Sequence, residues 1–511
     1  MKAIKNIMIA LSGIALLASC DMDKFFELDR PESNPWLSVD DLEYSVADPY
    51  NTLFQNPNWQ APIGIIPYYQ ELVADLSTVN PQGAYEQEAL YWYPRQMSTF
   101  DVTGQQFEKT FSILYRSVTG ATSPLTYIEE KEKKGEPVFA NMTENDKKTL
   151  ARQTGELYFM RGYTYWLISR AFVAPYDPAG GEGNNRKFIP LINRLDYSQE
   201  SARNPYMGTV KEVYDQMLSD FAKAKSLMPE DYFVRGRANK FSAAMMLMRV
   251  KWLMGDKDGA LEEADYVITK AEAGVAPFDL TEEPIVAFNR NAEQQYTVDP
   301  VSKEVMFECA FTESNQGNNV AIPLARMCKT GIYNFKSKTF DASNKLWLEG
   351  ARGSQNWQHG GWACAYWNPR LIKYIGWAVT DDPMDLTNYV PSAEALADKR
   401  FTQLHYFLKN YTDGGDKTIH EMAYNKTKWN AFWNDKYYRA PYGKYSQVPL
   451  IRLAEAYLTR ATLVLSKNAS QALGDVNKIR QRAGLTPLKN VTEADIEKER
   501  IKEFGFENGD R

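Results

Sequence analysis

The sequence predicts a mainly α-helical protein, a scaffold of repeated helical hairpins that carries long irregular loops and a few short strands. Three observations support this fold class. Apolar residues recur every three or four positions over several long stretches, which is the period of a helix with one buried face. Two such stretches are separated by a short turn and carry alanine where paired helices would touch. Between residues 275 and 445 the periodicity is lost, which indicates a loop-rich insertion.

The first 20 residues are typical of an export signal rather than of a folded element. Two lysines precede an apolar run at residues 7–18 that is short for a membrane span. Small residues then lead to Cys20, so the segment resembles a bacterial lipoprotein signal, in which this cysteine is lipidated and anchors the mature chain. An ordinary signal peptide that contains a cysteine is the alternative. We therefore expect a signal peptide at 1–19 and a lipidated tether at 20–36.

The helices can be placed from their start and stop signals. Ser38, followed closely by acidic residues, offers N-cap chemistry for a first helix. Residues 76–105 have the composition of a long polar and aromatic loop, and residues 304–311 of a short strand. Helical periodicity predicts seven further helices, at residues 146–173, 209–227, 240–253, 258–273, 447–466, 470–483 and 493–506.

The helices at 240–253 and 258–273 form the predicted hairpin. A glycine and an aspartate separate them, and small residues would let the two helices approach closely. The small residues at the contact positions are Ala243, Ala244, Ala260 and Ala264. This pattern resembles a tetratricopeptide unit, although a generic helical hairpin would show it too. The prediction is therefore a tetratricopeptide-like helical-repeat scaffold.

Composition and charge exclude several function classes. A net charge of -6 and a pI of about 5.5 provide no basic surface for nucleic acid. No apolar stretch after Cys20 is long enough to cross a bilayer. The histidines and the cysteines Cys309, Cys328 and Cys364 show no metal-ligand spacing, so we expect no metal and no cofactor. One pair of these cysteines could form a disulfide outside the cytoplasm.

Catalytic signatures are absent from the sequence. It has no GxSxG, Walker A or GxGxxG motif where chemistry would need one. With 65 acidic residues, chance pairs of carboxylates are abundant, so their spacing does not indicate a glycosidase. The turn at residues 413–416 could coordinate Ca²⁺ through its aspartates, but it lacks the full EF-hand pattern, so a plain surface turn is the favoured interpretation.

Several segments, taken in chain order, resemble the RagB/SusD family of outer-membrane nutrient-binding lipoproteins. They span nearly the whole mature chain, with the lipoprotein cysteine ahead of them. The segments are ELYFMRGYTYW at 156–166, IPL at 189–191, TVKEVY at 209–214, GRANK at 236–240, KEVMFE at 303–308, PLIRLAEAYL at 449–458, VNKIRQRAGL at 476–485, ER at 499–500 and ENGDR at 507–511. Each segment is weak alone, and their order makes the resemblance strong.

The resemblance implies a non-enzymatic protein of the outer membrane. Family members capture glycans or other nutrients at the cell surface and form a lid on a SusC-like TonB-dependent transporter. The acidic residues after Cys20 resemble a surface-export signal, whereas in enteric bacteria an aspartate there would indicate inner-membrane retention. The expected domain covers residues 37–511, with scaffold at about 37–75, 106–273 and 446–511 and a ligand-binding insertion at about 275–445. Family members usually continue further, so we expect a C-terminally shortened member or an incomplete sequence.

Ligand residues can be carried over from two regions of the family. A flat aromatic ring covers the C–H face of a sugar, and polar side chains satisfy its hydroxyl rim. The first region holds Tyr93 and Arg95, an aromatic two residues before an arginine, with Trp92 as an alternate. The second region supplies candidates by position only, namely Trp347, Trp357, Trp362, Trp367 and Asn368. The alternative is that these rings pack loops onto the scaffold.

Three functions compete on this sequence. The first is a surface glycan-binding lipoprotein that delivers oligosaccharide or polysaccharide to the transporter. The second is a scaffold of the same family that binds a peptide or another non-sugar nutrient. The third is an exported glycoside hydrolase, which would release sugar.

Overall fold

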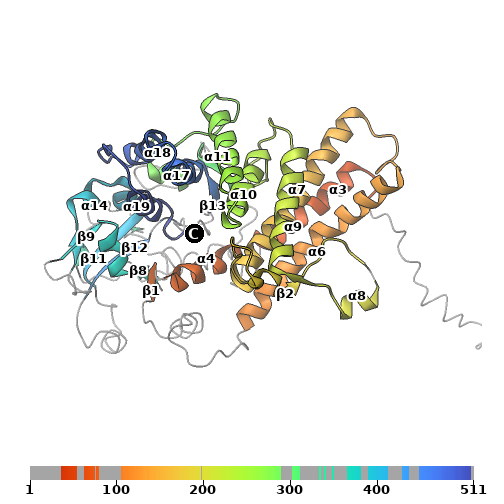
Figure 1. Cartoon of the computed structure of the whole chain (residues 1–511), viewed down its shortest axis with the longest axis horizontal. Helices are drawn as coiled ribbons and strands as arrows, with labels where there is room; N and C mark the ends of the chain where they lie inside the picture. The colour runs from red at the N-terminus through yellow and green to blue at the C-terminus, as the bar shows by residue number, and fades with distance from the viewer. Residues whose placement is uncertain are drawn as a thin grey trace, which may run out of the picture.

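The computed structural model is mainly helical, as the sequence predicts (Figure 1). Side-chain positions are described for residues 36–54, 62–67, 70–71, 74, 76–77, 108–196, 198, 200–201, 203–288, 302–310, 366–380, 389–405, 432–434, 436 and 448–507, and only the backbone for residues 68–69, 72–73, 78–79, 105–107, 199, 202 and 365. The backbone is also described for residues 333–334, 339–340, 348–349, 406–411 and 429–431. No helix among these residues is long and apolar enough to cross a membrane. The predicted signal peptide, Cys20 and the tether up to residue 35 lie outside the described residues.

Four long helices form the first part of the scaffold, at the right of Figure 1. They are α3 (Val39–Phe54), α6 (Gln105–Lys134), α7 (Glu144–Phe172) and α9 (Val210–Leu227). The cap predicted at Ser38 is present, since its hydroxyl accepts a hydrogen bond from the Asp41 amide at 3.2 Å. The long helix α6 lies in the predicted scaffold, although the sequence analysis assigned no separate helix there, and it contains Pro124.

Helices α7 and α9 approach each other closely at Gly162. A Cβ atom at Gly162 would lie 3.0 Å from the ring of Phe221. Beside this contact Arg161 and Asp220 form a buried ion pair, with Nε to Oδ2 at 2.9 Å and Nη2 to Oδ1 at 2.7 Å. Two parallel bonds fix the geometry of such a pair as well as its charge. The contact therefore sets the register of the two helices.

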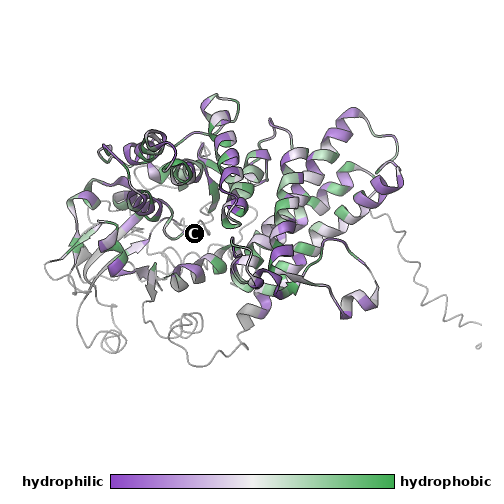
Figure 2. Cartoon of the chain, viewed as in Figure 1, coloured by the Kyte–Doolittle hydropathy of each residue, from purple (hydrophilic) through white to green (hydrophobic). Residues whose placement is uncertain are grey.

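The predicted hairpin is confirmed as α10 (Lys240–Leu253) and α11 (Lys257–Glu272). All four predicted alanines are fully buried where the helices touch. Figure 2 shows hydrophilic and hydrophobic segments alternating along the scaffold helices, as expected for helices with one buried face. Helix α11 packs in turn against α17 (Leu453–Val464), which continues to α18 (Ala469–Arg482) and α19 (Glu493–Phe504).

One predicted helix begins later than expected. Residues Val448–Arg452 form strand β13, which pairs antiparallel with β4 (Val305–Cys309), so the prediction of a helix from residue 447 is wrong there. All ten positions of the two strands are buried, and a continuous apolar run of this length does not distinguish a strand from a helix. The strand predicted at 304–311 is confirmed as β4.

The described part of the insertion consists of short elements around one small sheet, at the left of Figure 1. Strand β11 (His405–Tyr411) lies between β12 (Trp429–Asn434) and β7 (Leu348–Glu349). Short helices α13 (Pro369–Tyr374), α14 (Ala393–Ala397) and α15 (Lys399–Leu404) pack nearby, with the strand pair β9 (Ala378–Val379) and β10 (Val390–Pro391).

Candidate functional site

A two-stranded ladder joins the two regions that the sequence analysis selected as the ligand face. Strand β1 (Ser77–Val79) pairs antiparallel with β8 (Ala365–Trp367), and Ser77, Thr78 and Val79 lie opposite Trp367, Tyr366 and Ala365. Val79 and Ala365 are partners, so residues 80 and 364 continue from the same end of the ladder. In the sequence, β1 precedes the segment that carries residues 92–95, and β8 follows the segment that carries Trp357 and Trp362.

The small sheet connects the ladder of β1 and β8 to β7, the strand that follows the candidate Trp347. Strand β8 lies against β12, and the rings of Tyr366 and Trp433 are 5.4 Å apart. Across the sheet, Leu408 of β11 is the register partner of Leu348 in β7. Trp347 is the residue before β7. Strands β1, β8, β12, β11 and β7 are from here on called the ligand-face strands.

Trp367 belongs to the hydrophobic core, which corrects its assignment as a ligand contact. Its side chain is fully buried, so no ring face is available to a sugar. The ring packs edge-on against Phe506 at 5.0 Å and Trp377 at 5.6 Å. A Cβ atom at Gly505 would lie 2.2 Å from Trp367, so the close approach of the chain after α19 requires glycine. The alternative reading, that rings here pack loops onto the scaffold, holds for Trp367.

Asn368 caps a helix in this structure. It is the N-cap of α13, and its Oδ1 accepts a hydrogen bond from the Arg370 amide at 3.0 Å. Its own amide donates to the Leu76 carbonyl at 3.0 Å, which prolongs the ladder between β1 and β8. Asn368 therefore has a structural role beside the ligand face, and it is only partly buried.

The other candidates, Trp92, Tyr93, Arg95, Trp347, Trp357 and Trp362, lie outside the described residues, as does the acidic turn at 413–416. Their ligand contacts stay predictions. The structure describes their attachment points on the ligand-face strands.

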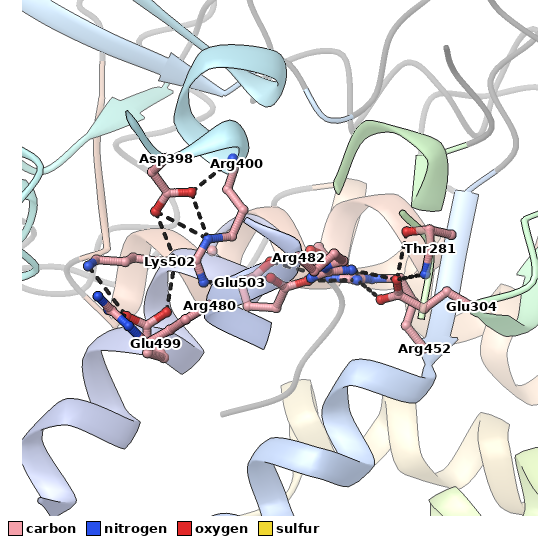
Figure 3. Close-up of polar contacts among 12 residues, drawn as sticks. Thr281, Glu304, Asp398, Arg400, Arg452, Arg480, Arg482, Glu499, Lys502 and Glu503 are labelled. Carbon is pink, nitrogen blue, oxygen red and sulfur yellow. Dashed lines mark hydrogen bonds and ion pairs between the residues drawn. The ribbon is translucent and has the colours of Figure 1, made fainter. Parts of the chain in front are cut away.

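A cluster of buried charges lies between the C-terminal helix and the base of the insertion (Figure 3). Its members come from segments far apart in the chain and are all buried. This charged cluster comprises Glu304, Asp398, Arg400, Lys436, Arg452, Arg480, Arg482, Glu499, Lys502, Glu503 and Glu507. Each of its acidic side chains forms an ion pair with an arginine or a lysine of the cluster.

Arg452, at the end of β13, lies at the centre of this charged cluster. Its guanidinium donates to Glu503 Oε1 at 2.9 Å and to both oxygens of Glu507 at 2.8 Å, and it also contacts Glu304. Burial alone would raise the pKa of Glu503, but the charges of Arg482 and Arg452 outweigh it and hold the pKa well below its usual range. The carboxylate thus stays ionised, and it is not poised as a general acid.

Lys436 connects the charged cluster to the ligand-face strands. It follows β12 by two residues and is fully buried. Its ammonium donates to the carbonyl oxygens of Glu503 at 2.6 Å and Gly505 at 2.8 Å, and to Glu507 Oε1 at 2.6 Å. A cation at these carbonyls caps the C-terminal end of α19, where the helix dipole is negative. The end of α19 and the strand β12 are therefore fixed to each other.

The residues of the charged cluster are those that sequence reasoning missed. Glu499 and Arg452 were quoted only as part of the family resemblance, with no role assigned. Acidic and basic residues on one face of the last helix normally indicate a solvated surface. Arg452 and Arg482 are buried. Only this burial would have indicated that the acidic residues of the last helix pair with arginines in the core and do not form a solvated surface.

Metal binding finds no support in the described part of the chain. It contains no group of three or more histidine, cysteine or acidic residues that could hold an ion. Cys309 is a free thiol, and burial raises its pKa well above the usual value. A thiol in this state is a poor ligand and a poor nucleophile.

Comparison with protein families gives two matches that together cover most of the chain. A family model described as starch-binding and associating with the outer membrane matches residues 56–251. A model of the SusD family matches residues 303–511. The first match ends within α10 and the second begins just before β4, so residues 252–302 lie between them.

Individual relatives agree with these matches. SusD-like protein P2 of Formosa agariphila is 25% identical over 354 residues, which is 68% of this chain but only 59% of that protein. The starch-binding protein SusD of Bacteroides thetaiotaomicron is 43% identical over 63 residues, or 12% of this chain and 11% of that protein. A solved structure of a SusD superfamily protein from the same organism has a TM-score of 0.64 at 18% identity and covers 92% of this chain and 87% of its own.

Proposed function

Because the chain belongs to the RagB/SusD family, we propose that it binds a glycan at the surface of the outer membrane and passes it to a SusC-like TonB-dependent transporter. In this proposal lipid on Cys20 anchors the protein, and residues of the two loops attached to β1 and β8 contact the oligosaccharide or polysaccharide. The protein does not cleave its ligand.

The single observation that carries the proposal is the ladder between β1 and β8. Residues 92–95 and residues 357–362 are more than 250 positions apart in the sequence, yet both segments are attached to the same end of this ladder. A sugar chain needs several aromatic and polar groups within a few ångströms of one another. The register of the ladder supports such a grouping, which neither segment could supply alone.

The chemistry of the described carboxylates favours binding over hydrolysis. A glycosidase needs two carboxyl groups beside the bond, one protonated and one ionised. In the charged cluster the acidic side chains are buried and paired with arginine or lysine. Such groups are fixed in the core and do not face a ligand.

The test is affinity electrophoresis of the chain without residues 1–20 through gels that contain one polysaccharide each. Trp92→Ala, Tyr93→Ala and Trp362→Ala run beside the unchanged protein. Tyr44→Ala is the matched control, because Tyr44 is 83% exposed on α3 and lies on the scaffold rather than on the ligand-face strands. Retardation by one class of glycan, lost in a folded loop variant and retained in the control, is the expected result.

Two other outcomes would overturn the proposal. If no glycan retards the folded protein, the ligand is a peptide or another non-sugar nutrient and not a glycan. If reducing sugar is released during incubation, the protein is a hydrolase. Delivery is tested separately by purifying the lipidated protein from outer membranes and asking whether a TonB-dependent transporter accompanies it.

A further inference from the structure

The helical scaffold carries an open groove of about 520 Å³ on a different part of the molecule from the ligand-face strands. Three consecutive helices, α9, α10 and α11, each present one face to it. Its apolar wall comes from Leu218 and Ala222 on α9 and Leu247 on α10. The volume is within the usual range for a binding site, roughly 300–1,000 Å³.

Lysine side chains dominate the rim of this groove. Glu263 accepts a hydrogen bond from Lys225 Nζ at 2.7 Å and another from Lys251 Nζ at 2.9 Å. One carboxylate shared by two ammonium groups leaves an excess positive charge. Because Glu263 is almost fully buried, the two lysines are also held in place on the wall.

A second set of side chains adds to this charge. Glu230 accepts hydrogen bonds from the Tyr266 hydroxyl at 3.0 Å and from Lys270 Nζ at 3.1 Å. Lys240, at the first position of α10, is half-buried, and its charge acts on Glu230 together with that of Lys270. Three lysines and two glutamates line the groove, and Lys270 beside it pairs with Glu230, on a chain whose net charge is -6. This groove is locally positive on an acidic protein, which favours an anionic partner.

The groove is unsuited to a sugar. Its one aromatic ring, Tyr266, is stacked on Phe241 with centroids 5.6 Å apart and an angle of 14°. Lys225 Nζ lies over the same ring at 4.2 Å from its centroid. With Phe241 and Lys225 packed on it, the Tyr266 ring offers no open face to a pyranose. The rest of the apolar wall is aliphatic.

We propose that this groove binds a protein segment in which acidic side chains flank an aliphatic one. The carboxylates would pair with Lys240 and with the lysines that share Glu263, and the aliphatic side chain would pack on Leu218 and Leu247. A groove with a hydrophobic floor and charged rim is the usual arrangement of a peptide site. The inference is independent of the glycan site.

The test measures fluorescence anisotropy of a labelled peptide that alternates glutamate with leucine. A lysine–leucine peptide and a glutamate–serine peptide test the charge and the apolar wall separately. Lys240→Glu is expected to weaken binding of the glutamate–leucine peptide about tenfold, because a repulsive charge replaces an attractive one. Salt at 0.5 M should weaken it as well. Lys257→Glu, an exposed change of equal charge on α11, is the matched control.

A second variant covers the case in which Lys240→Glu fails to fold. Leu218→Ser removes part of the apolar wall at a half-buried position and should also weaken binding severalfold. Equal affinity in either folded variant and in the unchanged protein would overturn the proposal, and so would equal binding of the lysine–leucine peptide or no binding of the acidic one. Loss of glycan retardation in Lys240→Glu would assign the groove to the glycan site and overturn it too.

Discussion

Replacing Trp367 by alanine should unfold the protein more easily without acting on the ligand directly. The indole is fully buried between Phe506, Trp377 and His405, with centroid distances of 5.0, 5.6 and 5.5 Å. A tryptophan side chain buries about 150–250 Å². At about 25 cal/mol per Å² this corresponds to about 4–6 kcal/mol as an upper estimate. Truncations of this kind cost about 3–5 kcal/mol, and we expect about 4 kcal/mol.

The assay is urea unfolding followed by circular dichroism, on the chain without residues 1–20. Trp252→Ala is the matched control, because Trp252 is only partly buried on α10 and is covered by Arg500 at 4.8 Å. It should lose about half as much stability or less. Trp367→Phe should keep glycan retardation, since the core position needs an aromatic ring and not an indole. A loss below about 1 kcal/mol for Trp367→Ala would refute the reasoning, because a core tryptophan cannot be so dispensable.

Two further predictions follow from the buried charges. Arg452→Met should lower the free energy of unfolding by about 3–5 kcal/mol, because Glu304, Glu503 and Glu507 would keep their charges in the core without their shared partner; thermal unfolding measures this, and an unchanged melting temperature would contradict it. Burial raises the pKa of Glu156 to about 7, against the opposing charge of Arg152, from a value of 4.5. The folded state thus holds this proton more tightly than the unfolded chain, so the stability from Glu156 is complete below about pH 4.5 and is lost as the pH rises through 7, by about 3 kcal/mol. In Glu156→Gln urea unfolding between pH 5 and pH 8 should show a weaker decline, and an identical decline would exclude Glu156 as its cause.

The helices could be predicted because their signals are local. The hairpin at α10 and α11 follows from alanines at helical spacing and from the short turn at Gly255 and Asp256. The same reasoning failed at residues 448–452, where an apolar run fits a strand and a helix equally well. Only the partner strand β4, 140 residues earlier in the chain, decides between them.

Only the local chemistry of the candidate site could be predicted, because the contacts between distant segments leave no local signal in the sequence. Sequence chemistry selects aromatic loops, but it does not say which rings face outward, and Trp367 turned out to lie in the core. The meeting of β1 with β8 is a long-range pairing that no periodicity encodes. The charged cluster was missed because its residues, from Glu304 to Glu507, become neighbours only in three dimensions.

The charged cluster also constrains the order in which the molecule can assemble. Helices α3, α6, α7 and α9 make contacts within the first 230 residues and can pack as soon as they leave the ribosome or the membrane. Asp398 and Glu304 already pair with Arg400, Arg452 and Arg482, but these arginines gain their full set of carboxylate partners only with Glu499, Glu503 and Glu507. Without these three glutamates the buried cations outnumber their carboxylate partners, which destabilises the core of the second half. A chain without α19 should therefore be more sensitive to proteolysis in its second half, because its buried arginines would keep only part of their partners.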